Sequence, residues 1–137
     1  MNMFDIQREI FTAVATEILT PYPSCRITNS FIYAPSVFPC VAIVLSNDGT
    51  DYNTRDSSKV DKFHDVTVTV DVYSNSHDGK KTEAETIMQL VIDKLFSLNF
   101  NMASCKPVSN INNASIYRIT ATFTAKVGND GTIYTRR

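Results

Sequence analysis

Hydrophobic and polar positions repeat with two different periods along this chain, and each period predicts one kind of element. Apolar residues at every third or fourth position predict two amphipathic helices, over residues 3–19 and from about Lys80 to Leu98. Strict alternation over residues 63–73 and 115–127 predicts two strands that each bury one face. These four segments form the predicted framework of the protein.

Three shorter segments are weaker strand candidates. Residues 25–33 and 101–109 carry mixed strand-forming residues, and residues 40–46 (CVAIVLS) are nearly all apolar. Such a short apolar run is typical of a strand buried on both faces. The two prolines in residues 34–39 predict a bend, because proline cannot donate to a central ladder.

The predicted order of elements is α-β-β-β-α-β-β, which indicates an α+β fold. Several connections between strands are too short for a crossover helix, so the sheet should be mostly antiparallel. We expect both helices to pack on one face. The opposite face, rich in threonine, should stay in water or meet another subunit. A chain of 137 residues fits a single domain spanning residues 1–137.

Two polar segments interrupt this framework. Residues 46–62 (SNDGTDYNTRDSSKVDK) predict a long polar loop, and residues 128–137 predict a flexible C-terminal tail that begins with a turn. Loops of this length are uncommon in compact domains unless they bind a partner or are disordered. The acidic residues of the loop lack the alternate spacing of a calcium site. A solvated loop and a protein-contact loop both remain open.

Charge and composition exclude several classes of function. Thirteen Lys and Arg residues balance fourteen Asp and Glu, so no clustered cations predict non-specific nucleic-acid binding. We expect no signal peptide, because charges interrupt the first apolar segment, and no membrane helix, because no apolar run approaches about 18 residues. Cys25, Cys40 and Cys105 are odd in number and far apart, which favours reduced, buried or partly buried thiols.

The segment before the second predicted helix is the sharpest enzyme candidate. Gly79 and Lys80 open a helix after a strand, as in a phosphate-binding loop. That motif also requires glycine at position 74 and Ser or Thr after the lysine, where this chain has Ser74 and Lys81. A helix start is therefore the better interpretation, and we expect no bound cofactor.

The remaining reactive residues form no local cluster. His64 and His77 each sit beside an aspartate, but neither has a second histidine at helical spacing or a nearby cysteine. We expect surface histidines and no metal site, although a Cys–His nucleophile assembled in space stays possible at this point. Arg118 lies on the polar face of the last long strand, where it can pair with Asp71 or contact another subunit. The residues alone favour a binding or assembly protein and no enzymatic activity.

Three segments in this order resemble the tail terminator proteins of long-tailed phages and prophages, also called tail completion or minor capsid proteins. They cover about residues 32–127 and read YAPSVFPCVAIVLSND, VTVTVDVYSNSHDGKKTEAETIMQLVIDKLFSLNF and IYRITATFTAKV. Their order and spacing are more specific than any one of them. Many members of the family have an acidic residue directly after the short apolar strand, where this chain has Leu45-Ser46-Asn47-Asp48.

The resemblance implies a structural virion protein that assembles in the host cytoplasm into a homohexameric ring. This ring would cap the tail tube, end its polymerisation and offer a surface for head–tail joining. The implied partners are other copies of the chain, the tail tube protein and the head–tail connector protein. A connector or stopper protein of the phage neck is the alternative. Candidate contacts with a subunit or the tube are Asp51, Tyr52, Arg55, Lys59, Lys80, Lys81 and Arg118.

Overall fold

The computed structural model describes residues 3–29, 38–50, 63–75, 80–108, 116–128 and 133–134. In chain order, the elements within these residues are α1 (Met3–Leu19), β1 (Arg26–Thr28), β2 (Cys40–Thr50), β3 (Phe63–Ser74), α2 (Lys80–Ser97), β4 (Asn101–Val108), β5 (Tyr117–Gly128) and β6 (Ile133–Tyr134). The α+β class and the order α-β-β-β-α-β-β are confirmed, and the two residues of β6 follow at the end.

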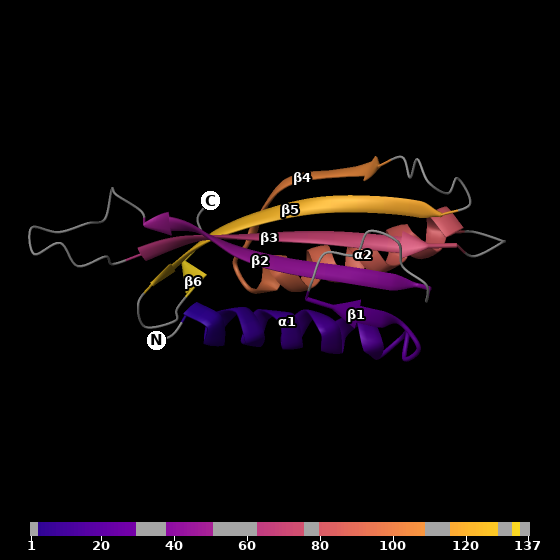
Figure 1. Cartoon of the computed structure of the whole chain (residues 1–137), viewed down its shortest axis with the longest axis horizontal. Coiled ribbons are helices and arrows are strands. Elements are labelled where there is room, and N and C mark those ends of the chain that lie inside the picture. The colour runs from indigo at the N-terminus through magenta and orange to yellow at the C-terminus, as the bar shows by residue number, and fades with distance from the viewer. Residues whose placement is uncertain are drawn as a thin grey trace, which may run out of the picture.

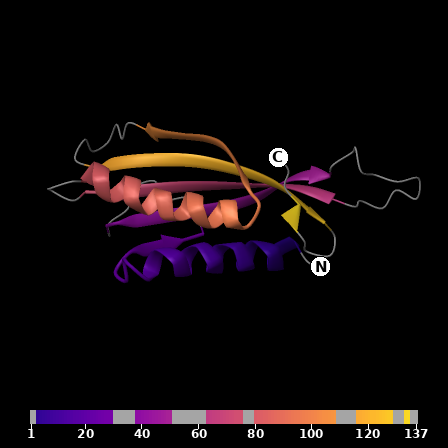
Figure 2. The same ribbon diagram turned by 180° about the vertical axis from the view of Figure 1, so that it is seen from behind.

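The strands form one six-stranded sheet in the order β1-β2-β3-β5-β4, with β6 paired to β5 (Figure 1). Only β1 and β2 pair in parallel among these strands, so the prediction of a mostly antiparallel sheet is confirmed. The long central strands β3 and β5 pair in continuous register from Phe63–Gly128 to Ser74–Tyr117. Both helices contact the same side of the sheet, and α2 lies across β3 and β5 (Figure 2).

Both helices form where the sequence pattern places them. In α1, Ile10, Val14 and Ile18 recur every four residues and are fully or nearly fully buried. At the end of α2, the N–H of Asn99 donates to the carbonyl of Phe96 and that of Phe100 to Leu95. This is the Schellman arrangement, and Asn99 takes the left-handed φ of 71° that it requires. Within the described residues, no helix is long and apolar enough to span a membrane.

The core lies between the helices and one face of the sheet. Alternate residues of β3 and β5 fill it, as the period of two predicts. The members contributed by β3 and β5 are Val66, Val68, Val70, Val72, Ile119, Ala121, Phe123, Ala125 and Val127. Four consecutive residues of β2, Cys40 to Ile43, are also buried, which confirms that this part of β2 is covered on both faces.

The structure corrects the boundary of the long polar loop. β2 continues through residues 46–50, where Asn47 pairs with Val66 and Thr50 with His64 across a register shift. Backbone pairing with β3 needs no apolar side chain, so a polar sequence can extend a strand here. The loop was therefore predicted to begin too early. Residues 51–62 lie outside the described residues.

Two other predicted segments differ from the structure. β1 is limited to Arg26–Thr28 instead of residues 25–33, of which residues 30–33 lie outside the description. The segment 128–137, expected to be a flexible tail, contributes the strand Ile133–Tyr134, which pairs with Lys126 and Val127 of β5. Two residues are enough to continue a ladder when a long neighbouring strand supplies the partner groups.

Candidate functional site

An ion pair lies on the sheet face opposite the helices. Arg118 on β5 donates from Nε and Nη2 to Oδ1 of Asp71 on β3, over 3.2 and 3.0 Å. The hydroxyl of Thr120 donates to the same carboxylate oxygen. These contacts confirm the predicted pairing of Arg118 with Asp71, because residues on adjacent strands at this register project from the same face.

The ion pair is largely removed from water. The side chain of Asp71 is 4% exposed and that of Arg118 is 23% exposed. The Arg118 guanidinium also lies 5.5 Å from the centre of the Tyr73 ring, within range of a cation–π contact. Burial raises the pKa of Tyr73, the negative charge of Asp71 raises it further, and Arg118 opposes both. Arg118 therefore has a structural role inside the protomer.

This face is less open than its threonine-rich sequence predicts. Cys40, Ala42, Asp71 and Tyr73 all project from it, and each is at most 3% exposed. Towards the other end of β3 and β5, Asp65 and Lys126 form a half-exposed ion pair of 3.4 Å. This face was expected to stay in water or meet another subunit, but at the Asp71 end these side chains are already buried within the protomer.

The lysine candidates lie at the start of α2. Lys81 is exposed, and Lys80 is the first residue of the helix. Nearby, the Ser74 hydroxyl donates to a Glu83 carboxylate oxygen over 2.6 Å, which ties the end of β3 to the first turn of α2. A carboxylate in this turn is also favoured by the helix dipole. The buried Ser74 therefore serves packing, where a phosphate-binding loop would need glycine.

The other candidate contact residues, Asp51, Tyr52, Arg55 and Lys59, lie outside the described residues and remain predictions. The same holds for Gly79 and His77. His64 lies in β3 opposite Val127. No group of three or more metal-ligating side chains comes together in the part of the chain that the structure describes.

The three thiols are poorly suited to nucleophilic catalysis. Burial, with smaller contributions from Cys40 and Glu83, raises the pKa of Cys25 to about 12. Burial also raises the pKa of Cys40, and desolvation of the inner part of its side chain raises the pKa of Cys105, which is exposed overall. Because the thiolate is the reactive form, none of these cysteines is activated at neutral pH. Cys105 is exposed on β4, which corrects the expectation that all three thiols would be at least partly buried.

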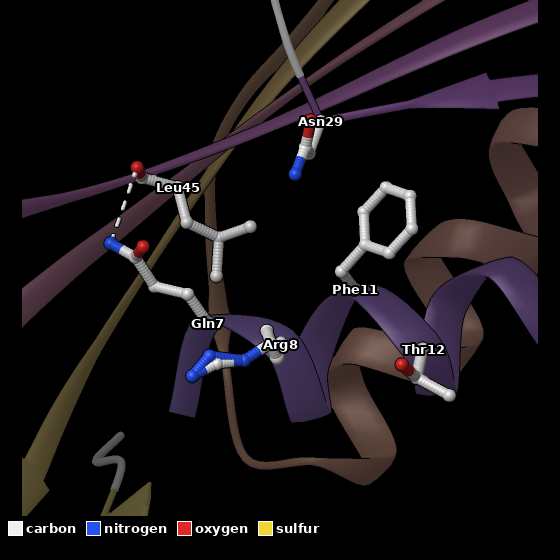
Figure 3. Close-up of a pocket in the computed structure, with 6 residues that line it drawn as sticks. All are labelled: Gln7, Arg8, Phe11, Thr12, Asn29 and Leu45. Carbon is white, nitrogen blue, oxygen red and sulfur yellow. Dashed lines mark hydrogen bonds between the residues drawn. The ribbon is translucent and has the colours of Figure 1, made fainter. Parts of the chain in front are cut away.

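Sequence reasoning missed a pocket between α1 and the β1–β2 edge of the sheet. It has a volume of about 470 Å³, and Gln7 Nε2 donates to the Leu45 carbonyl oxygen over 3.4 Å beside it (Figure 3). The lining residues are Gln7, Arg8, Phe11, Thr12, Asn29 and Leu45. They come from three segments far apart in the sequence, so no local motif could have indicated this pocket.

A second groove lies between α2 and the other edge of the sheet. Its volume is about 450 Å³, and its lining residues are Glu85, Met88, Gln89, Ile92, Cys105, Lys106, Pro107, Tyr117 and Ile119. Every residue of β4 from Asn101 to Pro107 is exposed.

Comparison with known proteins identifies a shared fold. No protein-family model matches the sequence, and no curated protein matches it. The structure is similar to a chain from the virion of a native gene transfer agent particle, with a TM-score of 0.57 and 16% sequence identity. The similarity covers 86% of this chain and 93% of that chain. At this identity, the similarity shows the fold.

Proposed function

We propose that this chain is a structural virion protein of the tail terminator type. The observation that carries the proposal is the shared fold, which extends over nearly the full length of a chain from the virion of a gene transfer agent particle. The three ordered sequence segments that resemble tail terminators independently support the same class. The two lines of support use different information, because one depends on residue identities and the other on backbone arrangement.

In this role the chain forms a homohexameric ring that caps the tail tube and stops its polymerisation. The exposed side of the ring then receives the head–tail connector protein. A cyclic ring needs two different, complementary patches on each subunit. The sheet has two chemically different edges, one formed by β4 and the other by β1 and β2, so it can supply such patches. No cofactor or enzymatic step enters this function.

The native mass of the purified chain, measured by light scattering at several concentrations, tests the ring. We expect a mass near six chains and an open annulus in electron micrographs. Mixing with purified tail tubes should then yield capped tubes that no longer elongate. If the protein neither forms a ring with tubes present nor stops elongation, the proposal is wrong.

The same experiment separates the neck alternative. A stopper or connector protein should bind the portal–adaptor side of the neck and leave tube elongation unchanged. Binding to that complex, with no binding to tail tubes, would assign the chain to the neck of the particle instead of the tail end.

A further inference from the structure

The two edges of the sheet are matched in length. β4 forms one edge and has eight residues. At the opposite edge, β1 pairs with three of the eleven residues of β2, Cys40 to Ala42, and among the described residues no strand pairs with this side of the other eight. An unpaired strand edge presents free N–H and C=O groups that can pair with another chain.

The outer side of β4 can donate hydrogen bonds from alternate residues. Pro107 has no N–H, and proline is tolerated in a sheet where its nitrogen faces away from the neighbouring strand. Because backbone N–H groups alternate in direction along a strand, the same geometry points the N–H of Cys105 outward. The side chains of this strand are exposed as well, so the backbone is accessible.

Where β2 has no strand neighbour in the described part of the chain, a side chain of α1 already binds its outer edge. The Leu45 carbonyl points towards α1 and accepts a 3.4 Å hydrogen bond from the Gln7 side chain (Figure 3). This is a long bond that a backbone N–H could replace. The pocket of about 470 Å³ adjoins this edge, and Asn29, the residue directly after β1, lines it. An added strand would therefore continue the line of β1.

Strand directions allow the two edges to pair. β2, β3, β5 and β4 are successively antiparallel, so β4 runs opposite to β2. Rotation of a second copy about an axis along the strands preserves these directions. β4 of one copy would then meet β2 of the next in the antiparallel sense. Such a head-to-tail contact repeats and can close into a ring.

The helix layer would continue across the same contact. α1 and α2 cover one face of the sheet, so α2 of one copy would lie beside α1 of the next. Glu85, Gln89 and Ile92 of α2 face β4 in the second groove, and Phe96 follows on the same helical stripe with 48% exposure. Met102 at the start of β4 is 40% exposed. The side chains of Phe96 and Met102 would become buried at this contact.

We propose that β4 of one copy adds to the free edge of β2 in the next copy, so that the occupant of this edge is a second copy of the same chain. The inference rests on the proposed ring and identifies the surfaces that join its subunits. In the assembled pair, the Cys105 N–H faces β2 of the next copy. A backbone N–H of the added strand replaces the Gln7 side chain as the donor to the Leu45 carbonyl.

The substitution Cys105→Pro tests the pairing, because it removes an outward N–H while leaving the inward bonds to β5. Cys105→Val is the matched control, since it changes the side chain and keeps the N–H. We expect the wild type and Cys105→Val to reach the ring mass, alone or on tail tubes. Cys105→Pro should remain a single chain under the same conditions, with an unchanged circular dichroism spectrum.

A cross-linking experiment tests the same contact without relying on the proline variant. Thr12 lines the pocket beside the β2 edge, and Cys105 is the exposed native thiol. In the assembled state, Thr12→Cys and a short bifunctional maleimide should give covalent multimers up to the size of the ring, whereas the wild type should give none. A Cys105–Cys105 dimer in the wild type would overturn the proposal in favour of pairing between two β4 strands.

The outcomes separate this inference from the proposed function. A Cys105→Pro protein that forms normal rings and caps tubes would overturn edge pairing and leave the terminator role intact. If assembled rings of the Thr12→Cys protein give no cross-linked chains with the maleimide reagent, edge pairing is likewise overturned and the terminator role is left intact. A wild-type protein that neither assembles nor stops tube elongation would instead remove the proposed function.

Discussion

β3 and β4 both pair with β5, yet they differ in almost every physical respect. β3 lies at the centre of the sheet, and its valines at positions 66, 68, 70 and 72 are at most 1% exposed beneath the helices. β4 lies at the edge, and its residues are exposed from Asn101 to Pro107. Pairing alone therefore does not bury a strand, because cover from the helix layer and a second neighbour are also needed. The centre stabilises the protomer, while the described side chains of the edge strand remain exposed.

Two alanine substitutions at paired positions of neighbouring strands should show the largest difference in stability between the centre and the edge of the sheet. Phe123 on β5 is fully buried and lies opposite Met102 on β4, which is 40% exposed. Phe123→Ala should lower the free energy of unfolding by about 3–5 kcal/mol, because it leaves a cavity in the core. Met102→Ala should change it by less than about 1 kcal/mol. Urea denaturation of the isolated protein measures both changes in the free energy of unfolding. Equal losses for the two variants would contradict the difference between a stabilising centre and an exposed edge.

The two ion pairs between β3 and β5 allow a second test on the sheet face opposite the helices, because one is buried and the other is half-exposed. Arg118→Ala leaves the Asp71 carboxylate buried without its cation, and should cost about 3 kcal/mol. Lys126→Ala breaks a pair whose side chains are 49% and 46% exposed. Solvent screening should keep that loss within about 0–1 kcal/mol.

A double variant provides the control for the buried ion pair. Replacing Asp71 and Arg118 together, with apolar residues of similar volume, should recover part of the stability lost in Arg118→Ala, because no unpaired charge remains. If Arg118→Ala and Lys126→Ala show the same loss in urea denaturation, the burial of the Asp71 pair does not set its strength.

The reactivity of the three thiols compares the buried Cys25 and Cys40 with the exposed Cys105 on β4 and needs no substitution. In the native protomer at neutral pH, an aromatic disulfide reagent should react quickly with Cys105 and slowly with Cys25 and Cys40, which are buried. Because the pKa of Cys25 is raised to about 12, its native thiol stays protonated when the unfolded thiol would ionise near its ordinary value. Its contribution to stability is therefore present below pH 9 and is lost as the pH rises towards 12.

The pH profile has its own control. Cys25→Val should flatten the decline of the free energy of unfolding between pH 9 and 12, whereas Cys105→Val should change the profile less. Three thiols reacting at one rate in the native protein would contradict the described burial.

Elements with a local pattern of apolar residues could be predicted from the amino-acid sequence alone. Apolar residues every four positions placed α1 at residues 3–19, and alternation placed the core face of β5, because each pattern records one buried side of one element. The pairing of Asp71 with Arg118 was also predictable, since both lie on polar faces of long strands. The segments that resemble tail terminators likewise depend on residue order alone.

Features that depend on contacts between distant segments became visible only in the folded structure. β2 extends through a polar segment because β3 supplies backbone partners, and β1 is short although its sequence permits a longer strand. The pocket joins Gln7, Asn29 and Leu45, which no sequence period connects. Among the described strands, the positions of β4 and of β1 and β2 at the two edges follow from the strand order. Backbone hydrogen bonds and contacts between distant segments carry little information in side-chain periodicity, so these features emerge only when the sheet is assembled.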